Sequence, residues 1–247
     1  MALVIGTACW SIPTIDAARF PVEGTSLERY AARLRGAEIN SSFHRSHRPA
    51  TWQRWAESVP EDFRFSAKIP KTITHKRKLV DCEALLDAYL AEAGALGGKL
   101  AVHLVQLPPS LALDPELVSS FFKLLRSSTT AAIACEPRHV SWFEADADAL
   151  LTELKVARVA ADPALGSAAA VPGGWGGLAY FRLHGSPVRY RSSYEEERLQ
   201  LYARQMQESE ARDIWCIFDN TASSAATGNA LSLAEMLEHA CTDPAQG

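Results

Sequence analysis

The sequence predicts an α/β fold: a single TIM-type (β/α)8 barrel whose sixth crossover is irregular. Short apolar runs alternate with longer amphipathic segments over the 247 residues, and eight such runs are the number that closes a parallel barrel. Most runs are apolar at nearly every position, as expected of strands that are covered on both faces. An open, doubly wound sheet is the alternative that the same alternation allows. The predicted strands are 3–7, 37–41, 63–68, 100–107, 131–136, 156–162, 178–184 and 214–220.

Helix-start signals precede several of the segments between these strands. Apolar residues recur at helical spacing over 27–34, 52–59 and 85–93. Residues 163–177 are rich in Ala, Gly and Pro and contain no convincing helix, so the sixth crossover is predicted to be irregular. No break in composition divides the chain, and residues 1–247 are expected to form one domain. Capping boxes or an N-cap before proline predict three helix starts: Thr25 with Glu28, Ser193 with Glu196, and Asp114 before Pro115.

The bulk composition is that of an ordinary globular protein. Apolar residues make up 47% and charged residues 22%, and 25 basic against 29 acidic residues leave a formal net charge of −4. A nucleic-acid binder that relies on bulk charge is usually strongly basic, so any anion affinity must come from local clusters. The apolar N-terminal stretch is too short for a signal peptide, and no segment has the length to cross a bilayer. We therefore expect a cytoplasmic protein with no membrane partner. The 5 cysteines are scattered, without the close spacing of a zinc or redox motif.

Polar residues gather just where the predicted strands end, which is the face where active sites of such barrels are built. We call this face, the carboxyl ends of the strands, the mouth. Because side chains alternate along a strand, Glu38 shares a face with Asn40, and Arg182 shares one with His184. The predicted catalytic residues are Glu38, Lys68, Glu136 and His184. The predicted ligand-binding residues are Trp10, Asn40, His44, His75, Gln106, Arg138, His139, Trp142, Asp162, Arg182, Tyr190 and Asn220.

A purely structural interpretation of these charges stands beside the catalytic one. A buried charge needs a partner, so Glu38 or Glu136 could pair with Lys68 or Arg182 without taking part in chemistry. The loops after the third and seventh strands are nevertheless rich in basic residues, whereas many acidic residues lie on predicted helices. A locally positive mouth attracts anions more strongly than the net charge suggests. For residues 76–78 a solvated charge run is the favoured interpretation.

No strong cofactor or metal motif is present. Carboxylates and imidazole from Glu38, Glu136, Asp162 and His184 could in principle bind Mg²⁺, Mn²⁺ or Zn²⁺, but no spacing demands it. We therefore predict no metal site, and the sequence leaves the cofactor unknown. The chain also lacks a G-x-S-x-G elbow and a complete phosphate-binding loop.

An ordered set of strand-end motifs resembles the YecE-like family, labelled only as domain of unknown function 72. The resemblance covers residues 5–237 and implies an eight-stranded β/α barrel but no established activity. The chain departs from the family pattern at Cys9, His44 and Asp219, where glycine, tyrosine and asparagine are more usual. The motifs are GTACW (6–10), EINSSF (38–43), FSAK (65–68), TH (74–75), QLPPS (106–110), EPRHVSWF (136–143), RLHG (182–185) and DNT (219–221).

Three functions fit these observations. The first is an enzyme that uses acid–base chemistry on a small anionic ligand, such as a phosphorylated sugar or a nucleotide-like compound. The second is nucleic-acid binding, or metal-assisted phosphodiester cleavage, across the same face. The third is a sensor or scaffold without catalysis. The sequence favours the first, and it fixes neither the reaction class nor the oligomeric state.

Overall fold

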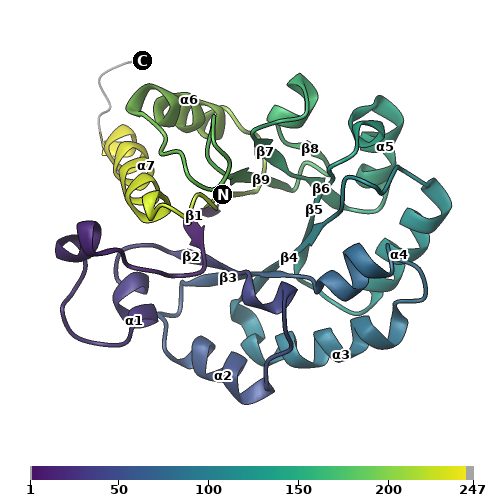
Figure 1. Cartoon of the computed structure of the whole chain (residues 1–247), viewed down its shortest axis with the longest axis horizontal. Coiled ribbons are helices and arrows are strands. Elements are labelled where there is room, and N and C mark those ends of the chain that lie inside the picture. Colours follow the sequence, from purple (N-terminus) through teal and green to yellow (C-terminus); the bar gives the residue numbers. More distant parts are fainter. Residues whose placement is uncertain (1, 243–247) are drawn as a thin grey trace.

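The computed structural model describes residues 2–242, and its strands form one ten-stranded sheet curled into a barrel (Figure 1). Neighbouring strands pair in parallel in the order β7-β9-β10-β1-β2-β3-β4-β5-β6, and β8 adds an antiparallel pair to β6. The predicted barrel is confirmed, and the open sheet is excluded. The strands are β1 (Ala2–Ala8), β2 (Gly36–Ile39), β3 (Arg64–Lys68), β4 (Leu100–Gln106), β5 (Ala132–Glu136), β6 (Val156–Arg158), β7 (Ala160–Asp162), β8 (Gly173–Gly174), β9 (Leu178–Leu183) and β10 (Asp213–Phe218).

The sixth strand closes the barrel in two segments. β6 pairs with β5, whereas β7, which follows after Val159, pairs with β9. The Val159 amide still donates to the carbonyl of Cys135 at 2.8 Å, so the strand stays attached to β5 where it changes partner. The predicted strand 156–162 thus closes the barrel, because its first part pairs with β5 and its last part pairs with β9.

Seven α-helices surround the strands in Figure 1. They are α1 (Ser26–Ala31), α2 (Pro49–Glu57), α3 (Glu83–Ala93), α4 (Pro115–Ser127), α5 (Ala145–Glu153), α6 (Glu196–Gln207) and α7 (Ala225–Thr242). Short helical turns occupy several loops: η1 (Thr14–Arg19), η2 (Ser41–Phe43), η3 (Thr72–Lys76), η4 (Gly94–Lys99), η5 (Val140–Phe143) and η6 (Ser167–Ala170). No helix within residues 2–242 is both long enough and apolar enough to span a bilayer.

Two of the three predicted helix starts are confirmed. Thr25 and Glu28 form a capping box, in which the Glu28 amide donates to Thr25 Oγ1 and the Thr25 amide donates to Glu28 Oε2. Asp114 Oδ1 accepts from two amides of the first turn of α4, where Pro115 lacks a donor. The box predicted at Ser193 is wrong: α6 begins after Glu195, and the Ser193 hydroxyl is directed to another helix.

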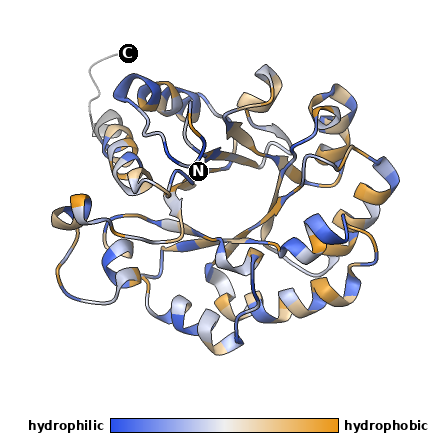
Figure 2. Cartoon of the chain, viewed as in Figure 1, coloured by the Kyte–Doolittle hydropathy of each residue, from blue (hydrophilic) through white to orange (hydrophobic). Residues whose placement is uncertain are grey.

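The core has two layers, as the alternation of side chains along the strands requires. One cluster fills the barrel interior and includes the rings of Tyr180 and Trp215, stacked with centroids 6.0 Å apart. The larger cluster lies between barrel and helices and includes Trp52, Phe65 and Phe122, all fully buried. Each such side chain stabilises the fold by roughly 1.5–3 kcal/mol. Figure 2 shows hydrophobic colour along the strands and hydrophilic colour mainly on helices and loops.

The irregular sixth crossover is also present. Residues 163–177 contain only η6 and β8 instead of an α-helix. Buried Arg158 holds this segment, because its guanidinium donates to the carbonyl of Ala168 at 2.7 Å and to Asp148 at 2.7 and 2.9 Å. Hydrogen bonds from the Arg158 side chain therefore attach this segment to the barrel, where a helix would attach through its apolar side chains.

Candidate functional site

The register of the sheet decides which polar side chains enter the barrel. Arg182 lies beside Ile217 of β10, a residue of the interior cluster, so Arg182 points inward. Gln106 lies beside Glu136 on β4 and β5, and these two share the inward face with Leu104. Gln106, Glu136 and Arg182 thus point into the barrel at the same end of the strands.

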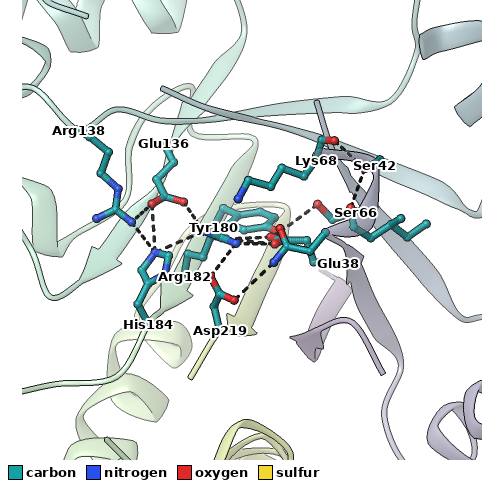
Figure 3. A network of polar contacts seen from close by, with 12 residues as sticks. Glu38, Ser42, Ser66, Lys68, Glu136, Arg138, Tyr180, Arg182, His184 and Asp219 are labelled. Atoms are coloured by element: carbon teal, nitrogen blue, oxygen red, sulfur yellow. Dashed lines mark hydrogen bonds and ion pairs between the residues drawn. The ribbon is translucent and has the colours of Figure 1, made fainter. Parts of the chain in front are cut away.

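Arg182 is the centre of a buried network, which we call the Arg182 cluster (Figure 3). Its Nε lies 3.0 Å from Glu38 Oε2, its Nη1 lies 3.0 Å from Glu136 Oε2, and its Nη2 lies 2.7 Å from Glu38 Oε1 and 2.9 Å from Asp219 Oδ2. Burial opposes the charge of Arg182, but the three carboxylates hold its pKa well above the ordinary value. The members of the cluster are Glu38, Glu136, Arg138, Arg182, His184 and Asp219.

Every nitrogen of the Arg182 guanidinium is therefore engaged by the protein's own carboxylates. Four of its five N–H donors face these carboxylates, and Nη1 also lies 3.5 Å from His184 Nε2. Arg182 thus lies between the carboxylates of Glu38, Glu136 and Asp219, and its ligand-binding role stays a prediction. Removing one partner of such a buried pair leaves an uncompensated charge, which is why the set is mutually dependent.

Glu38 is likewise enclosed. Besides the two bonds from Arg182, Glu38 Oε2 lies 3.1 Å from the hydroxyl of Tyr180, which is also 3.0 Å from Ser66 Oγ. A carboxylate only accepts, so Tyr180 donates to Glu38 and accepts from Ser66. Burial and the nearby Glu38 charge raise the pKa of Tyr180 well above its usual value, which keeps this donor in place. Glu38 has no exposed surface, and its catalytic role stays a prediction.

His184 joins the cluster to a third carboxylate. Its Nδ1 lies 3.0 Å from Asp219 Oδ2, and its Nε2 lies 2.6 Å from Arg138 Nη2 and 3.1 Å from Glu136 Oε1. The Nδ1 atom of His184 thus faces the Asp219 carboxylate, and its Nε2 faces both the Arg138 guanidinium and the Glu136 carboxylate. Arg138 also forms an ion pair with Glu136. The geometry is that of an imidazole oriented by a carboxylate, the arrangement used for proton transfer.

The pKa values of two carboxyl groups of the cluster, Glu136 and Asp219, are lowered. Burial would raise the pKa of Glu136, but Arg138, Arg182 and His184 together hold it well below its ordinary value. Burial would likewise raise the pKa of Asp219, but the charge of Arg182 and the hydrogen bond with His184 outweigh burial and lower this pKa.

Lys68 ends β3 and differs from every other cation at this face. It is 6% exposed, and its Nζ lies 4.2 Å from the centroid of the Phe43 ring. Within the described part of the chain Nζ makes no hydrogen bond and no ion pair, and in Figure 3 no dashed line reaches it. Burial, followed by the neighbouring charge of Arg182, lowers the pKa of Lys68 to about 8. An amine of this kind is partly neutral near pH 8 and can act as a base or a nucleophile.

Several other predicted residues lie close to this cluster. Asn40 is half-buried, its Nδ2 lies 3.5 Å from Asp219 Oδ1, and its own Oδ1 has no partner among the described residues. The rings of His44 and His75 each lie 5.0 Å from the Phe43 ring, and burial and the charge of Lys68 lower the pKa of His75. Asn40 thus contacts Asp219, and both histidines contact the Phe43 ring over which Lys68 Nζ lies.

Tyr190 covers His184. It is 40% exposed, and its ring meets the imidazole edge-on at 5.6 Å. The Tyr190 amide donates to the His184 carbonyl, and the Ala222 amide donates to the Tyr190 carbonyl at 3.0 Å. His184 consequently has no exposed surface while this loop is in place.

The structure places other predicted residues away from the mouth. Asp162 lies beside Leu183 rather than Arg182, so it faces α6, where Arg198 lies 3.3 Å away. Trp142 is fully buried and donates from Nε1 to the carbonyl of Leu111. Alternation along the strand turns Asp162 outward, because Val159, three residues earlier, belongs to the interior cluster, and Trp142 packs in the core. The ligand-binding roles of these two residues stay predictions.

Three further predicted residues have structural partners of their own. Trp10 packs edge-on against Trp55 at 5.2 Å, at the rim of the core. His139 caps η5, where its Nδ1 accepts from the Ser141 amide. Asn220 is buried and donates to the carbonyl of Ser192 in the loop after β9.

Sequence reasoning missed Asp219, Tyr180 and Ser66 as members of the site. The alternation rule could have found Asp219, because it follows Ile217 by two residues and so shares the inward face, whereas Asn220 does not. Tyr180 and Ser66 sit in apolar strand runs and gave no separate signal. Among residues 2–242, no group of three or more His, Cys, Asp or Glu side chains is arranged to hold a metal ion.

Comparisons with known proteins agree with this architecture. The model of a family described as "Protein of unknown function DUF72" matches residues 4–246. The UPF0759 protein YecE of Escherichia coli (strain K12) is 34% identical over 84 residues, 34% of this chain and 31% of that protein. The match thus spans about a third of that relative's length.

Solved structures match over nearly the whole chain. A DUF72 family protein from Enterococcus faecalis V583 superposes with a TM-score of 0.80 at 21% identity, covering 96% of this chain and 95% of that one. A DUF72 family protein from Thermotoga maritima MSB8 gives 0.79 at 22%, covering 96% and 100%. A D-allulose 3-epimerase from Methylomonas sp. gives 0.52 at 13%, covering 97% and 99%. At these identities the likeness concerns the fold.

Proposed function

This chain belongs to the DUF72 family of proteins of unknown function, and we propose that it is an enzyme that binds a small anionic ligand at the barrel mouth. The favoured ligand class is a phosphorylated sugar or a nucleotide-like compound. The observation that carries the proposal is Lys68, a buried amine without a hydrogen-bond or ion-pair partner in the described chain, placed beside an imidazole–carboxylate pair.

The proposed chemistry is proton transfer. Lys68, with a pKa of about 8, is the reacting amine that contacts the ligand. His184, oriented by Asp219 and flanked by Glu136, is the second acid–base group, and it becomes accessible when the Tyr190 ring moves aside. Arg182 and Glu38 keep these carboxylates in position.

Unsatisfied polar atoms at the mouth support a hydroxylated anion as the ligand. Asn40 Oδ1 is a buried acceptor without a donor, and Arg138 Nε is a buried donor without an acceptor, within residues 2–242. Buried polar groups normally have partners, so each marks a contact that a ligand can supply. A hydroxyl suits Asn40, and an anionic oxygen suits Arg138. The fold shared with D-allulose 3-epimerase fits a sugar-like ligand.

A thermal-shift experiment tests this proposal. Phosphorylated sugars should raise the melting temperature, and the same sugars without phosphate should raise it less, because binding to the folded state alone stabilises it. Gln106→Ala should reduce the shift, since Gln106 is half-buried on the inward face at the end of β4. Gln53→Ala, on the exposed side of α2, is the matched control and should leave the shift unchanged. An equal shift with and without phosphate would remove the anionic part of the proposal.

Nucleic-acid binding is the second candidate, and exposed basic loops favour it. The five side chains concerned are exposed and form no ion pair with described residues: Lys76, Arg77, Lys78, Arg189 and Arg191. A labelled oligonucleotide should then bind with an affinity that falls steeply as salt rises. Affinity that is absent at low salt would exclude this function. For either candidate we propose a cytoplasmic location, in keeping with the free thiols of Cys9, Cys82, Cys135 and Cys216.

A further inference from the structure

We propose that Lys68 forms a Schiff base with the carbonyl group of a small aldehyde or ketone bound at the mouth. This inference rests on the proposed function: it makes the reacting amine a nucleophile, and it limits the ligand to carbonyl compounds.

The placement of Lys68 separates it from the other lysines. It is the one buried lysine of residues 2–242, yet its ammonium has no hydrogen-bond acceptor. Lys99, in contrast, lies just before β4, and its Nζ donates to the carbonyls of Ala56 and Val59 at 2.9 and 2.6 Å. Burial without an acceptor destabilises the cation, and Nζ contacts the Phe43 ring at 4.2 Å, so no hydrogen bond with a described residue has to break before Nζ meets an incoming atom.

The surroundings of Lys68 favour its neutral form before the reaction. Its pKa of about 8 comes first from burial and then from the charge of Arg182, the two means by which proteins activate lysine as a nucleophile. At pH 7.5 about a quarter of such an amine is neutral, against about a thousandth at the ordinary value of 10.5.

The same surroundings also accommodate the product. A protonated imine carries one positive charge, as the ammonium did, so the charge of the site does not change. Glu38, Glu136 and Asp219 interact favourably with a cation at Nζ, and this attraction extends to the iminium. The cluster therefore suits a cation that is formed by reaction as well as one formed by protonation.

The step balances without a further co-reactant. The Lys68 ammonium releases one proton to water, and the Nζ lone pair adds to the carbonyl carbon while the C–O π pair moves to oxygen. A proton passes from nitrogen to that oxygen to give the carbinolamine. The C–O bond then breaks, the hydroxyl leaves as water with one proton returned from solvent, and the nitrogen lone pair forms the C=N bond of the protonated imine.

Reductive trapping tests the inference on the full-length protein. The protein is incubated at pH 7.5 with dihydroxyacetone phosphate or with D-glyceraldehyde 3-phosphate, borohydride is added, and the product is analysed by intact mass and peptide mapping. The expected result is one adduct per chain, equal to the ligand less one oxygen atom, on the peptide that contains Lys68. The label on Lys68 should exceed that on any exposed lysine by roughly 250-fold, the ratio of the neutral fractions above.

Matched variants and the thermal shift separate the possible outcomes. Lys68→Met should abolish the adduct, and Lys71→Met, the same change three residues later, should not. Should Lys68→Met fail to fold, the peptide map of the unaltered protein still locates the adduct. A thermal shift without an adduct on Lys68 would overturn the Schiff base and leave the proposed function standing. Equal trapping of dihydroxyacetone with and without its phosphate would support the Schiff base and contradict the anionic ligand.

Discussion

Glu38 Oε1 lies 2.7 Å from Arg182 Nη2. Both side chains have no exposed surface, and they come from strands far apart in the sequence, β2 and β9. Both oxygens of Glu38 are engaged by the guanidinium, a paired geometry that is stronger than a single contact. The other two carboxylates of the cluster are oriented by the same guanidinium, so this pair fixes the geometry of the mouth.

Glu38→Gln should therefore destabilise the protein strongly. The amide keeps the size of the side chain but leaves Arg182 short of one negative charge, and breaking a buried pair costs about 3–5 kcal/mol. Urea unfolding measures the change. Glu61→Gln, on a side chain that is 98% exposed, is the matched control and should change the free energy of unfolding by less than about 0.5 kcal/mol. A similar small effect for both variants would show that the buried pair contributes little.

Lys68 should make stability rise with pH between about 8 and 10.5. Its pKa is about 8 in the folded protein and near 10.5 unfolded, so the unfolded state binds more protons in this range. The cost of the buried ammonium is present below pH 8 and disappears as pH rises toward 10.5. Urea unfolding at a series of pH values measures this change. Across this window the free energy of unfolding of the unaltered protein should rise, relative to that of Lys68→Met, by an amount on the order of 3 kcal/mol. Parallel curves for the two proteins would contradict the lowered pKa.

Tyr190→Ala should expose His184 to reagents in solution. The ring that covers the imidazole at 5.6 Å is lost, whereas the backbone contacts of the loop do not depend on it. The rate of modification of His184 by diethylpyrocarbonate, followed by peptide mapping, should rise several-fold. Tyr190→Phe keeps the ring and should behave like the unaltered protein. Unchanged protection in Tyr190→Ala would mean that other groups cover His184.

Asn229→Ala should loosen the loop that carries Tyr190. Asn229 of α7 accepts from the Tyr194 amide at 3.1 Å and from Asn220 Nδ2 at 2.9 Å, and its own Nδ2 donates to the Tyr194 carbonyl at 3.0 Å. Losing these buried bonds leaves their partners unsatisfied, at roughly 1–3 kcal/mol each. Hydrogen exchange should accelerate over residues 185–194, which Asn229 contacts, more than over β1 (Ala2–Ala8), which Asn229 does not hydrogen-bond. Uniform acceleration over the whole chain would indicate global destabilisation instead.

Local sequence patterns determined the architecture. Eight apolar runs at barrel spacing, the capping box at Thr25 and the N-cap at Asp114 depend on neighbours a few residues away, and all are present in the structure. The Gly-rich and Pro-rich stretch after the sixth strand was visible for the same reason. At Ser193 the local pattern failed because Asn229, distant in sequence, engages that segment.

The roles of the polar residues were decided only by the tertiary structure. Residue type and strand parity brought Glu38, Lys68, Glu136, Arg182 and His184 to one end of the barrel, but parity cannot say which carboxylate meets which cation. Ion pairing depends on distances between strands far apart in sequence. In the fold Arg182 contacts three carboxylates, whereas Lys68 Nζ lies over the Phe43 ring and forms no ion pair with a described residue. Alternation relates Asp219 to Ile217 and Asp162 to Ala160, but which of these residues faces the interior was decided by the packing of the barrel.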